Sequence, residues 1–364
     1  MNRLCRSSYG SLEAVINLDS YDGEPGRKLW HFNQRGPKDR WCAYEVISEV
    51  PLSGGSIIQN QPWRAHQAHG DLEVIVLEED GRLQHYTSRN TMHGSAWSNS
   101  ESSIEHYTGP WKHSATITRT EGWIPIFFDA APLILCREPM GDTTYRAALE
   151  TVALDENRNL THYRCPQYRQ MGGESPRPDV WHKGAVIVKS ADVVGAAYLY
   201  LARDNLLAAI VSTTRGVEEY YFQSNEWHFV TIVNERGGPS CVYTTLLPEY
   251  KMKFNMVIQG GEAGGEATCL EKAWESRGNW VPNASKMPFA LSSHPFIHSE
   301  SEGEMNLISV VPKSDVVGAR AITFQPCGTS PYGPWMILQW HHLEEFKEWV
   351  VCGVVVPHIA GMPM

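Results

Sequence analysis

The sequence predicts an all-β fold made of repeated four-stranded units, and three observations carry this prediction. Three segments share the pattern Leu-x-His-aromatic: Leu29–Phe32, Leu83–Tyr86 and Leu160–Tyr163. An alternating apolar run precedes each of them, over residues 12–18, 72–77 and 149–154. A segment that opens with tryptophan follows each of them, at the evenly spaced positions Trp41, Trp111 and Trp181. Period-two alternation rich in β-branched and aromatic residues is the signal of a β-strand.

Three weaker copies of the unit follow along the chain. They cover residues 206–212, 217–223 and 227–233, then 253–259, 267–274 and 280–286, and finally 305–311, 337–342 and 349–355. One more short apolar stretch precedes the alternating run, as in residues 56–59 and 296–298, and residues 4–13 take this place in the first unit. Each unit therefore contains four strands.

Repeated sheets of this kind predict one closed architecture. A lone four-stranded sheet cannot bury both of its faces, whereas radial stacking of several sheets does so and leaves a central channel. We therefore predict a single β-propeller domain over residues 1–364 with about six blades. Their approximate bounds are 1–50, 51–120, 121–190, 191–235, 236–288 and 289–356.

The repeated aromatic and histidine positions are expected to be structural. The tryptophan that opens each fourth strand is interpreted as a wedge between neighbouring blades, and the histidine on the third strand as a hydrogen-bonding residue. The six tryptophans are Trp41, Trp111, Trp181, Trp227, Trp280 and Trp349.

Composition limits the partners. The net charge of the 364-residue chain is −10 and no basic run is present, which argues against a nucleic-acid partner. No apolar stretch is long enough to span a bilayer. The residues at the start of the chain lack a signal-peptide apolar region, so we expect a form from which a leader was removed. The oligomeric state is left open.

Two features favour a secreted or lumenal protein. Asn159-Leu160-Thr161 and Asn283-Ala284-Ser285 are acceptor sequences for N-glycosylation. The eight cysteines show no CxxC and no zinc-ligand spacing, and they fall in pairs within the units. The expected pairs are Cys5 with Cys42, Cys136 with Cys165, Cys241 with Cys269, and Cys327 with Cys352, of which Cys241 with Cys269 is preferred. Buried free thiols in a cytoplasmic protein are the alternative.

No cofactor or metal is predicted. The sequence contains no P-loop, no GxGxxG after a strand, no HExxH and no GxSxG. Any chemistry is therefore expected to use side chains and confinement alone.

The inner strands supply the candidate site residues. Aligned on the alternating runs, they carry polar residues that differ from unit to unit: Arg6, Gln59, Asn60, Asp129, Tyr198, Tyr200, Arg203, Tyr243, His298 and Glu300, with Trp63 and Arg64 just after the second inner strand. A lectin with one sugar site per blade would repeat its binding residues together with its scaffold. Here only the scaffold repeats, which favours one pocket in the channel, with aromatic faces and a few titratable groups that suit a flat, oxygen-bearing aromatic ligand. Polar residues facing a water-filled channel are the structural alternative.

The pattern of Ser56–Gln59, Leu72–Leu77, Leu83–Tyr86 and Trp111 resembles the repeat of lectin-like β-propellers of bacteria and fungi. Within the fungal branch, the size, the divergent blades and the glycosylation sequences are similar to those of the hetero-Diels–Alderases of tropolone–sesquiterpenoid pathways. This resemblance implies a cofactor-free reaction in which a hydroxymethyl-tropolone loses water and the resulting quinone methide adds across an alkene of a humulene-type terpene. No catalytic motif is carried over from it.

That chemistry assigns expected roles to the candidate residues. Loss of water needs a proton donor at the leaving oxygen and a base or cation at the ring oxygen. His298, Glu300, Tyr243 and Arg64 are the catalytic candidates. Arg6, Gln59, Trp63, Phe128, Tyr198, Tyr200 and Arg203 are the substrate-binding candidates, with Trp63, Tyr200 and Phe128 packing the terpene. A carbohydrate-binding lectin and a secreted interaction scaffold without chemistry are the alternatives.

Overall fold

The chain is all-β, as the sequence predicts. The computed structural model describes residues 4–7, 11–19, 26–34, 41–52, 54–60, 71–90, 108–119, 133–139, 145–167, 180–189, 192–202, 206–235, 238–247, 251–259, 268–273, 279–282, 296–299, 305–312, 335–343 and 348–354. Within these ranges there is no α-helix.

The described strands form six antiparallel sheets, each of four strands that follow one another in the chain. Sheet 1 contains β1 (Leu4–Arg6), β2 (Leu12–Asp19), β3 (Arg27–Gln34) and β4 (Cys42–Ser48). Sheet 2 contains β5 (Ser56–Gln59), β6 (Leu72–Leu77), β7 (Arg82–Asn90) and β8 (Thr108–Arg119). Sheet 3 contains β9 (Leu133–Pro139), β10 (Tyr145–Leu154), β11 (Leu160–Gln167) and β12 (His182–Val188).

The other three sheets repeat this order. Sheet 4 contains β13 (Val193–Leu201), β14 (Leu207–Thr213), β15 (Gly216–Gln223) and β16 (Glu226–Asn234). Sheet 5 contains β17 (Gly238–Leu247), β18 (Lys251–Gln259), β19 (Thr268–Ala273) and β20 (Val281–Pro282). Sheet 6 contains β21 (Phe296–Ser299), β22 (Met305–Pro312), β23 (Trp335–Leu343) and β24 (Glu348–Val354).

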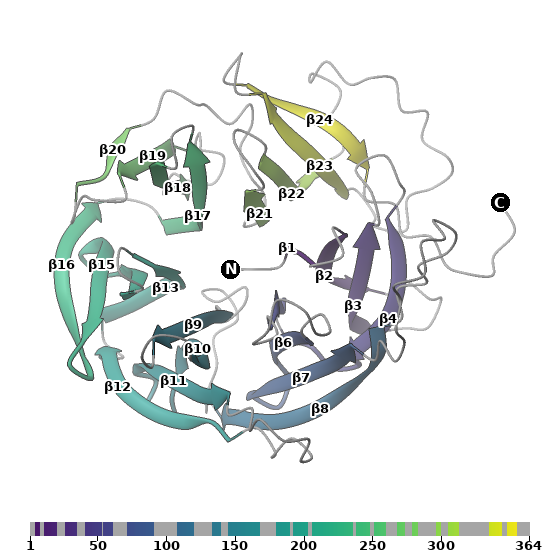
Figure 1. Cartoon of the computed structure of the whole chain (residues 1–364), viewed down its shortest axis with the longest axis horizontal. Coiled ribbons are helices and arrows are strands. Elements are labelled where there is room, and N and C mark those ends of the chain that lie inside the picture. Colours follow the sequence, from purple (N-terminus) through teal and green to yellow (C-terminus); the bar gives the residue numbers. More distant parts are fainter. Residues whose placement is uncertain are drawn as a thin grey trace, which may run out of the picture.

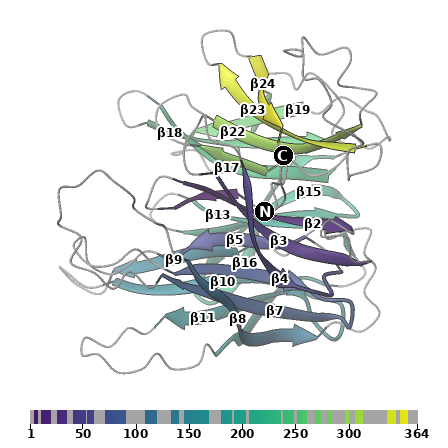
Figure 2. The same ribbon diagram turned by 90° about the vertical axis from the view of Figure 1, so that its right-hand side faces the viewer.

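The sheets are arranged in a ring with the first strand of each nearest the centre (Figure 1). Each first strand contacts the first strand of the next sheet, from β1 through β5, β9, β13 and β17 to β21, and β21 contacts β1. In the side view the strands of sheet 1 lie between those of sheets 2 and 6 (Figure 2). The first and last sheets of the chain are therefore neighbours.

In sheets 1, 2 and 4, where the structure describes side-chain burial most fully, the second strand is the most deeply buried and the fourth the least. All residues of β6 and β14 are buried, whereas every residue of β16 is either exposed or half-buried. Apolar clusters join consecutive sheets: Val15 and Leu29 of sheet 1 pack with Val74 of sheet 2, and Val152 of sheet 3 packs with Val211 of sheet 4. The core is thus a series of layers between sheets, as radial stacking requires.

The six tryptophans occupy equivalent places at the start of the fourth strands, which confirms their predicted position. Trp41, Trp181 and Trp280 directly precede β4, β12 and β20, and Trp111, Trp227 and Trp349 lie in β8, β16 and β24.

The predicted disulfide pairs are wrong wherever the structure describes both residues. Cys241 and Cys269 both lie opposite Val257, so β18 separates them. Residues two strands apart are about 9–10 Å apart, beyond the separation of about 7 Å that a disulfide tolerates. Cys136 and Cys165 are likewise separated by β10, Cys5 and Cys42 lie on opposite edges of sheet 1, and no disulfide joins Cys5, Cys42 or Cys165. Cys327 lies outside the described residues.

The first inner strand is also shorter than expected. The sequence suggested one strand over residues 4–13, but β1 ends at Arg6, and the backbone N–H of Ser7 donates to the carbonyl of Ser11 at 2.8 Å. Glu13 therefore belongs to β2.

Candidate functional site

A buried glutamate–histidine pair recurs in the first three sheets. The glutamate lies on the second strand and the histidine on the third, and their side chains meet within the sheet. The distances from histidine Nε2 to the carboxylate are 2.8 Å for His31 and Glu13, 3.0 Å for His85 and Glu73, and 2.7 Å for His162 and Glu150. The register is the same each time, because the histidine faces the residue two positions after the glutamate.

The tryptophan of the following sheet packs against each of these histidines. The indole Nε1 of Trp111 donates to Nδ1 of His31 at 3.4 Å, and Trp181 donates to His85 at the same distance. In both cases the rings are nearly perpendicular. Since Nδ1 accepts this bond, Nε2 carries the proton that points at the carboxylate. The wedge role of the tryptophan and the hydrogen-bonding role of the histidine are confirmed here.

A further side chain, two residues after the histidine, contacts the same carboxylate. Asn33 Nδ2 donates to Glu13 at 2.8 Å and Thr87 Oγ1 donates to Glu73 at 2.7 Å. In sheet 3, Arg164 Nε lies 3.1 Å from Glu150. All three carboxylates therefore accept hydrogen bonds from, or form ion pairs with, neighbouring side chains, as buried charges require.

The contact between sheets 3 and 4 departs from this pattern. The rings of His162 and Trp227 have the usual near-perpendicular geometry, with centroids 5.5 Å apart. However, His162 Nδ1 and Trp227 Nε1 are both buried without a hydrogen-bond partner. Phe222 packs against both rings. This interface depends on ring contacts rather than on the indole hydrogen bond.

The contact between sheets 4 and 5 replaces the pair altogether. On the third strand of a sheet, the histidine lies three positions before the residue that faces the tryptophan of the same sheet. This position holds His85 in sheet 2 and Glu219 in sheet 4. Glu219 faces Ile210, so Ala208 takes the place of the glutamate on the second strand. The cation that pairs with Glu219 is Lys272, which comes from β19 of the next sheet. The charge pair therefore crosses from one sheet to another.

Lys272 is fully enclosed by polar and aromatic groups of both sheets. Its Nζ contacts Glu219 Oε1 and lies 2.9 Å from the hydroxyl of Tyr200 and 3.2 Å from that of Tyr221. The ammonium also lies 4.9–5.6 Å from the ring centroids of Tyr200, Tyr221, Phe254 and Trp280. Trp280 Nε1 donates to the second oxygen of Glu219 at 3.3 Å.

Burial and charge act on the pKa values in this cluster. Burial lowers the pKa of Lys272, and the carboxylate of Glu219 opposes that shift. Burial raises the pKa of Tyr200 well above its usual range, and the nearby charge of Glu219 adds to the effect. The tyrosine hydroxyl therefore stays protonated and can donate to Glu219, while burial and the carboxylate act on the Lys272 pKa in opposite directions.

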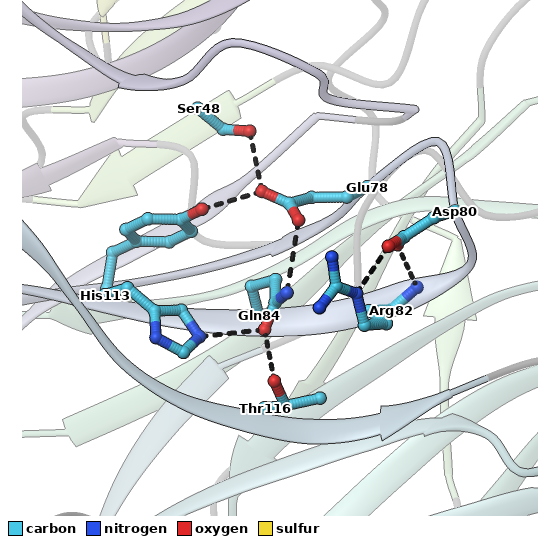
Figure 3. A network of polar contacts seen from close by, with 8 residues as sticks. Ser48, Glu78, Asp80, Arg82, Gln84, His113 and Thr116 are labelled. Atoms are coloured by element: carbon cyan, nitrogen blue, oxygen red, sulfur yellow. Dashed lines mark hydrogen bonds and ion pairs between the residues drawn. The ribbon is translucent and has the colours of Figure 1, made fainter.

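A second polar network joins sheets 1 and 2 (Figure 3). The buried carboxylate of Glu78 accepts from Ser48 Oγ at 2.9 Å, Tyr86 OH at 2.6 Å and Gln84 Nε2 at 3.1 Å. The amide oxygen of Gln84 accepts from Thr116 Oγ1 at 2.7 Å and lies 3.0 Å from His113 Nε2. The chain of contacts thus runs from an exposed histidine to a buried carboxylate.

The sequence-predicted site residues are only partly described. Tyr198 and Tyr200 lie on β13 and are buried, and Gln59 is half-buried on β5. The structure gives the strand position but not the side chain of Arg6 on β1, Tyr243 on β17 and His298 on β21. Trp63, Arg64, Phe128, Arg203, Glu300 and Asn283 lie outside the described residues. Of the predicted residues, Tyr200 belongs to the Lys272 cluster.

Asn159 lies in the turn between β10 and β11 and is half-buried. Its backbone N–H donates to Asp155 Oδ1 at 2.9 Å, and the hydroxyl of Thr161 donates to Asp155 Oδ2 at 3.2 Å.

Sequence reasoning missed the acidic residues and Lys272. A signal for the acids was present, because Leu12-Glu13, Leu72-Glu73 and Leu149-Glu150 repeat the same dipeptide at the start of each alternating run. No such signal marks Lys272, since it departs from the repeat. No group of His, Cys, Asp or Glu suited to a metal ion occurs among the described residues. No helix in that part of the chain is long and apolar enough to cross a membrane.

No family model matches the sequence, and no curated protein matches it. Among solved structures, the chain is similar to AofleA from Arthrobotrys oligospora, with a TM-score of 0.51, 9% identity and coverage of 98% of this chain and 96% of that one. A protein of unknown function from Dyadobacter fermentans gives a TM-score of 0.46 at 12% identity, covering 84% of this chain and 88% of that one. A luciferin-regenerating enzyme gives 0.41 at 11%, covering 94% and 88%. The likeness to AofleA, at 9% identity, shows a shared β-fold and leaves the activity open.

Proposed function

We propose that the ring is a six-bladed β-propeller and that the chain is a cofactor-independent hetero-Diels–Alderase. The proposed substrates are a hydroxymethyl-tropolone and a humulene-type sesquiterpene alkene. The observation that carries the proposal is the contrast between the repeated and the unrepeated positions. At the described contacts between sheets 1, 2 and 3, the repeated glutamate, histidine and tryptophan satisfy one another. The residues at the aligned inner-strand positions differ from sheet to sheet, which supports one site at the centre rather than one per sheet.

The proposed reaction begins with loss of water. A general acid protonates the hydroxyl of the hydroxymethyl group, the carbon–oxygen bond breaks, and a base removes the proton of the ring hydroxyl. The product is a neutral quinone methide with a conjugated ring carbonyl. His298 and Glu300 are the proposed acid–base groups, and Tyr243 and Arg64 are proposed to hold the ring oxygen.

The second step joins two neutral partners. The carbonyl oxygen and the exocyclic methylene carbon of the quinone methide bond to the two alkene carbons of the terpene, so no atom is lost. Most of the gain in rate would come from holding the partners face to face and from excluding water, which would otherwise add back to the quinone methide. Trp63, Phe128 and Tyr200 are the proposed apolar contacts of the terpene. Arg6, Gln59, Tyr198 and Arg203 complete the proposed substrate-binding set.

A carbohydrate-binding lectin is the second candidate, because one observation favours it. Each contact between sheets 1, 2 and 3 brings a carboxylate, an imidazole and an indole together. Carboxylates bind hydroxyl groups and aromatic faces pack on sugar rings. The resemblance of the sequence repeat to that of lectin-like β-propellers is compatible with this function. A sugar would have to displace the side-chain contacts that close these groups.

Turnover and sugar binding separate the two candidates. The purified chain is incubated with a hydroxymethyl-tropolone and humulene, and the adduct is quantified by mass spectrometry. If His298 is the acid–base group, His298→Ala lowers turnover by roughly 10²-fold or more without loss of the fold. The matched control is His182→Ala, at an exposed position on the outer strand β12. Binding of a simple sugar at several sites per chain, with no adduct formed, would assign the chain to the lectins.

We further propose that the chain passes through the secretory pathway and carries glycans at Asn159 and Asn283. The two acceptor sequences support this. A fall in apparent mass after enzymatic removal of N-glycans, reduced in Asn159→Gln and in Asn283→Gln, is the expected result. An unchanged mass in protein from a eukaryotic host would favour the cytoplasm.

A further inference from the structure

We propose that the contact between sheets 4 and 5 is a binding site for a primary alkylammonium group, which the chain fills with its own Lys272. The site consists of Glu219, Tyr200, Tyr221, Phe254 and Trp280, and we call it the ammonium site. Lys272 and Glu219 are fully buried and have no role in the proposed cycloaddition, whereas Tyr200 is also a proposed contact of its terpene substrate.

The acceptors of the site match the donors of a primary ammonium. An ammonium group carries three N–H donors and no acceptor. Lys272 Nζ meets one carboxylate oxygen and two phenol oxygens: Glu219 Oε1, Tyr200 OH at 2.9 Å and Tyr221 OH at 3.2 Å. Every N–H donor of the ammonium therefore has an oxygen partner. A quaternary ammonium has no N–H to donate to these three oxygens, and a neutral hydroxyl has only one donor for them.

The aromatic rings add a second element of selectivity. Four rings surround the ammonium, and the closest centroid, that of Trp280, is 4.9 Å from Nζ. Aromatic faces attract cations through the ring quadrupole, and several such faces around one charge form the kind of cage that recognises organic ammonium ligands. The side chain of Glu219 is fully buried as well, so the attraction acts away from bulk water.

The cation enters the site from outside the sheet that forms most of it. Glu219, Tyr200 and Tyr221 belong to sheet 4, whereas Lys272 belongs to β19 of sheet 5. In sheets 1, 2 and 3 the glutamate meets its partner within its own sheet. Sheet 4 therefore supplies most of the groups that bind the cation, and sheet 5, which is hydrogen-bonded separately, supplies the cation.

The test is chemical rescue of Lys272→Ala. This substitution removes the methylenes beyond Cβ together with the ammonium, which are the atoms that n-propylammonium supplies. The folding equilibrium of the variant is measured by urea unfolding with n-propylammonium chloride, with 1-propanol as the neutral molecule of the same shape, and with sodium chloride at equal ionic strength. Well above its Kd, n-propylammonium is expected to raise the ratio of folded to unfolded protein at least about tenfold over 1-propanol.

Two matched variants make the result specific. Lys183→Ala removes a lysine whose ion pairs with Asp155 and Glu156 lie near the surface, and n-propylammonium should not rescue it. Lys272→Ala combined with Glu219→Gln should lose the preference for the cation over the alcohol. Equal effects of the amine and the alcohol on folded Lys272→Ala would overturn the proposal.

A variant that does not fold unaided still decides the question. Lys272→Met fills the site with a neutral side chain of similar length and is expected to fold without responding to n-propylammonium. If Lys272→Ala is unfolded, refolding in n-propylammonium but not in 1-propanol supports the ammonium site. Failure to refold in either, while Lys272→Met folds, contradicts it.

Discussion

The indole Nε1 of Trp111 donates a hydrogen bond to Nδ1 of His31, a residue that lies 80 positions earlier in the chain and in the preceding sheet. The bond fixes the histidine tautomer, so that Nε2 points its proton at Glu13, 2.8 Å away. Trp181, His85 and Glu73 repeat the relationship one sheet later. These contacts connect consecutive sheets through polar groups as well as through apolar packing.

His85→Ala is expected to destabilise the protein more than His162→Ala. Removing His85 leaves the indole N–H of Trp181 without its acceptor and Glu73 without one donor, at about 1–3 kcal/mol for each buried group. His162 has no bond to Trp227 to lose, and Arg164 still pairs with Glu150. Urea unfolding measures both variants, with the exposed His113→Ala as control. Equal losses for His85→Ala and His162→Ala would contradict the role given to the indole bond.

Stability is expected to fall at high pH because several tyrosines hold their protons more tightly when folded. Burial, followed by the contact with Glu78, raises the pKa of Tyr86, and burial and Glu218 do the same for Tyr220. A raised pKa contributes stability that is complete below the unfolded value of about 10 and is lost as pH rises through the folded value. The free energy of unfolding should therefore decline above about pH 10.

The contribution of Tyr86 is isolated by Tyr86→Phe. This variant loses the hydrogen bond to Glu78, and its stability should decline less steeply in alkali than that of the parent chain. Unfolding in urea at pH 8, 10 and 11 is the measurement, with absorbance of the phenolate as a second readout. A slope equal to that of the parent would show that Tyr86 titrates alike in both states.

Gly216→Ala is expected to be much more harmful than Gly26→Ala. Both glycines have positive φ, +124° and +125°, where an L side chain costs about 1–3 kcal/mol. At Gly216 a Cβ would also lie 2.3 Å from the carbonyl oxygen of Asn234, whereas nothing lies within 4 Å at Gly26. The overlap involves backbone of the paired strand β16, so it should add about 1–3 kcal/mol or more. Thermal unfolding of the two variants provides the comparison.

Thiol labelling should separate Cys42 from Cys5 and Cys165. Cys42 is exposed, whereas Cys165 is buried, and burial together with Glu13 raises the pKa of the Cys5 thiol. Since the thiolate is the reactive form, iodoacetamide at pH 8 should modify Cys42 first in the folded protein. Peptide mapping after timed quenching identifies the modified residue. Resistance of Cys42 in folded protein, relieved only by a reductant, would mean that it is oxidised after all.

The repeat was predictable because its signals are short in range. Strand alternation, the Leu-x-His pattern and the opening tryptophan all act within one unit, and the three copies reinforce one another. The disulfide pairs were not predictable from the sequence, because pairing depends on strand order. Cys241 and Cys269 belong to one unit, yet β18 lies between them. The Lys272 site was missed for a related reason, since it forms between two units and uses residues that break the pattern. The place of Tyr200 on an inner strand follows from the repeat, but its partners depend on the register of sheets 4 and 5.

The contact between β1 and β21 has a consequence for how the ring assembles. Every other pair of neighbouring sheets is consecutive in the chain, so a connecting segment limits how far one sheet can diffuse from the next. Sheets 1 and 6 have no such tether and must find each other across the whole length of the polypeptide. The entropic cost of closing this loop therefore weakens a single contact, the seam between sheets 1 and 6. Under stress this seam should open first, and hydrogen exchange should be faster at β1 and β21 than at β9 and β13.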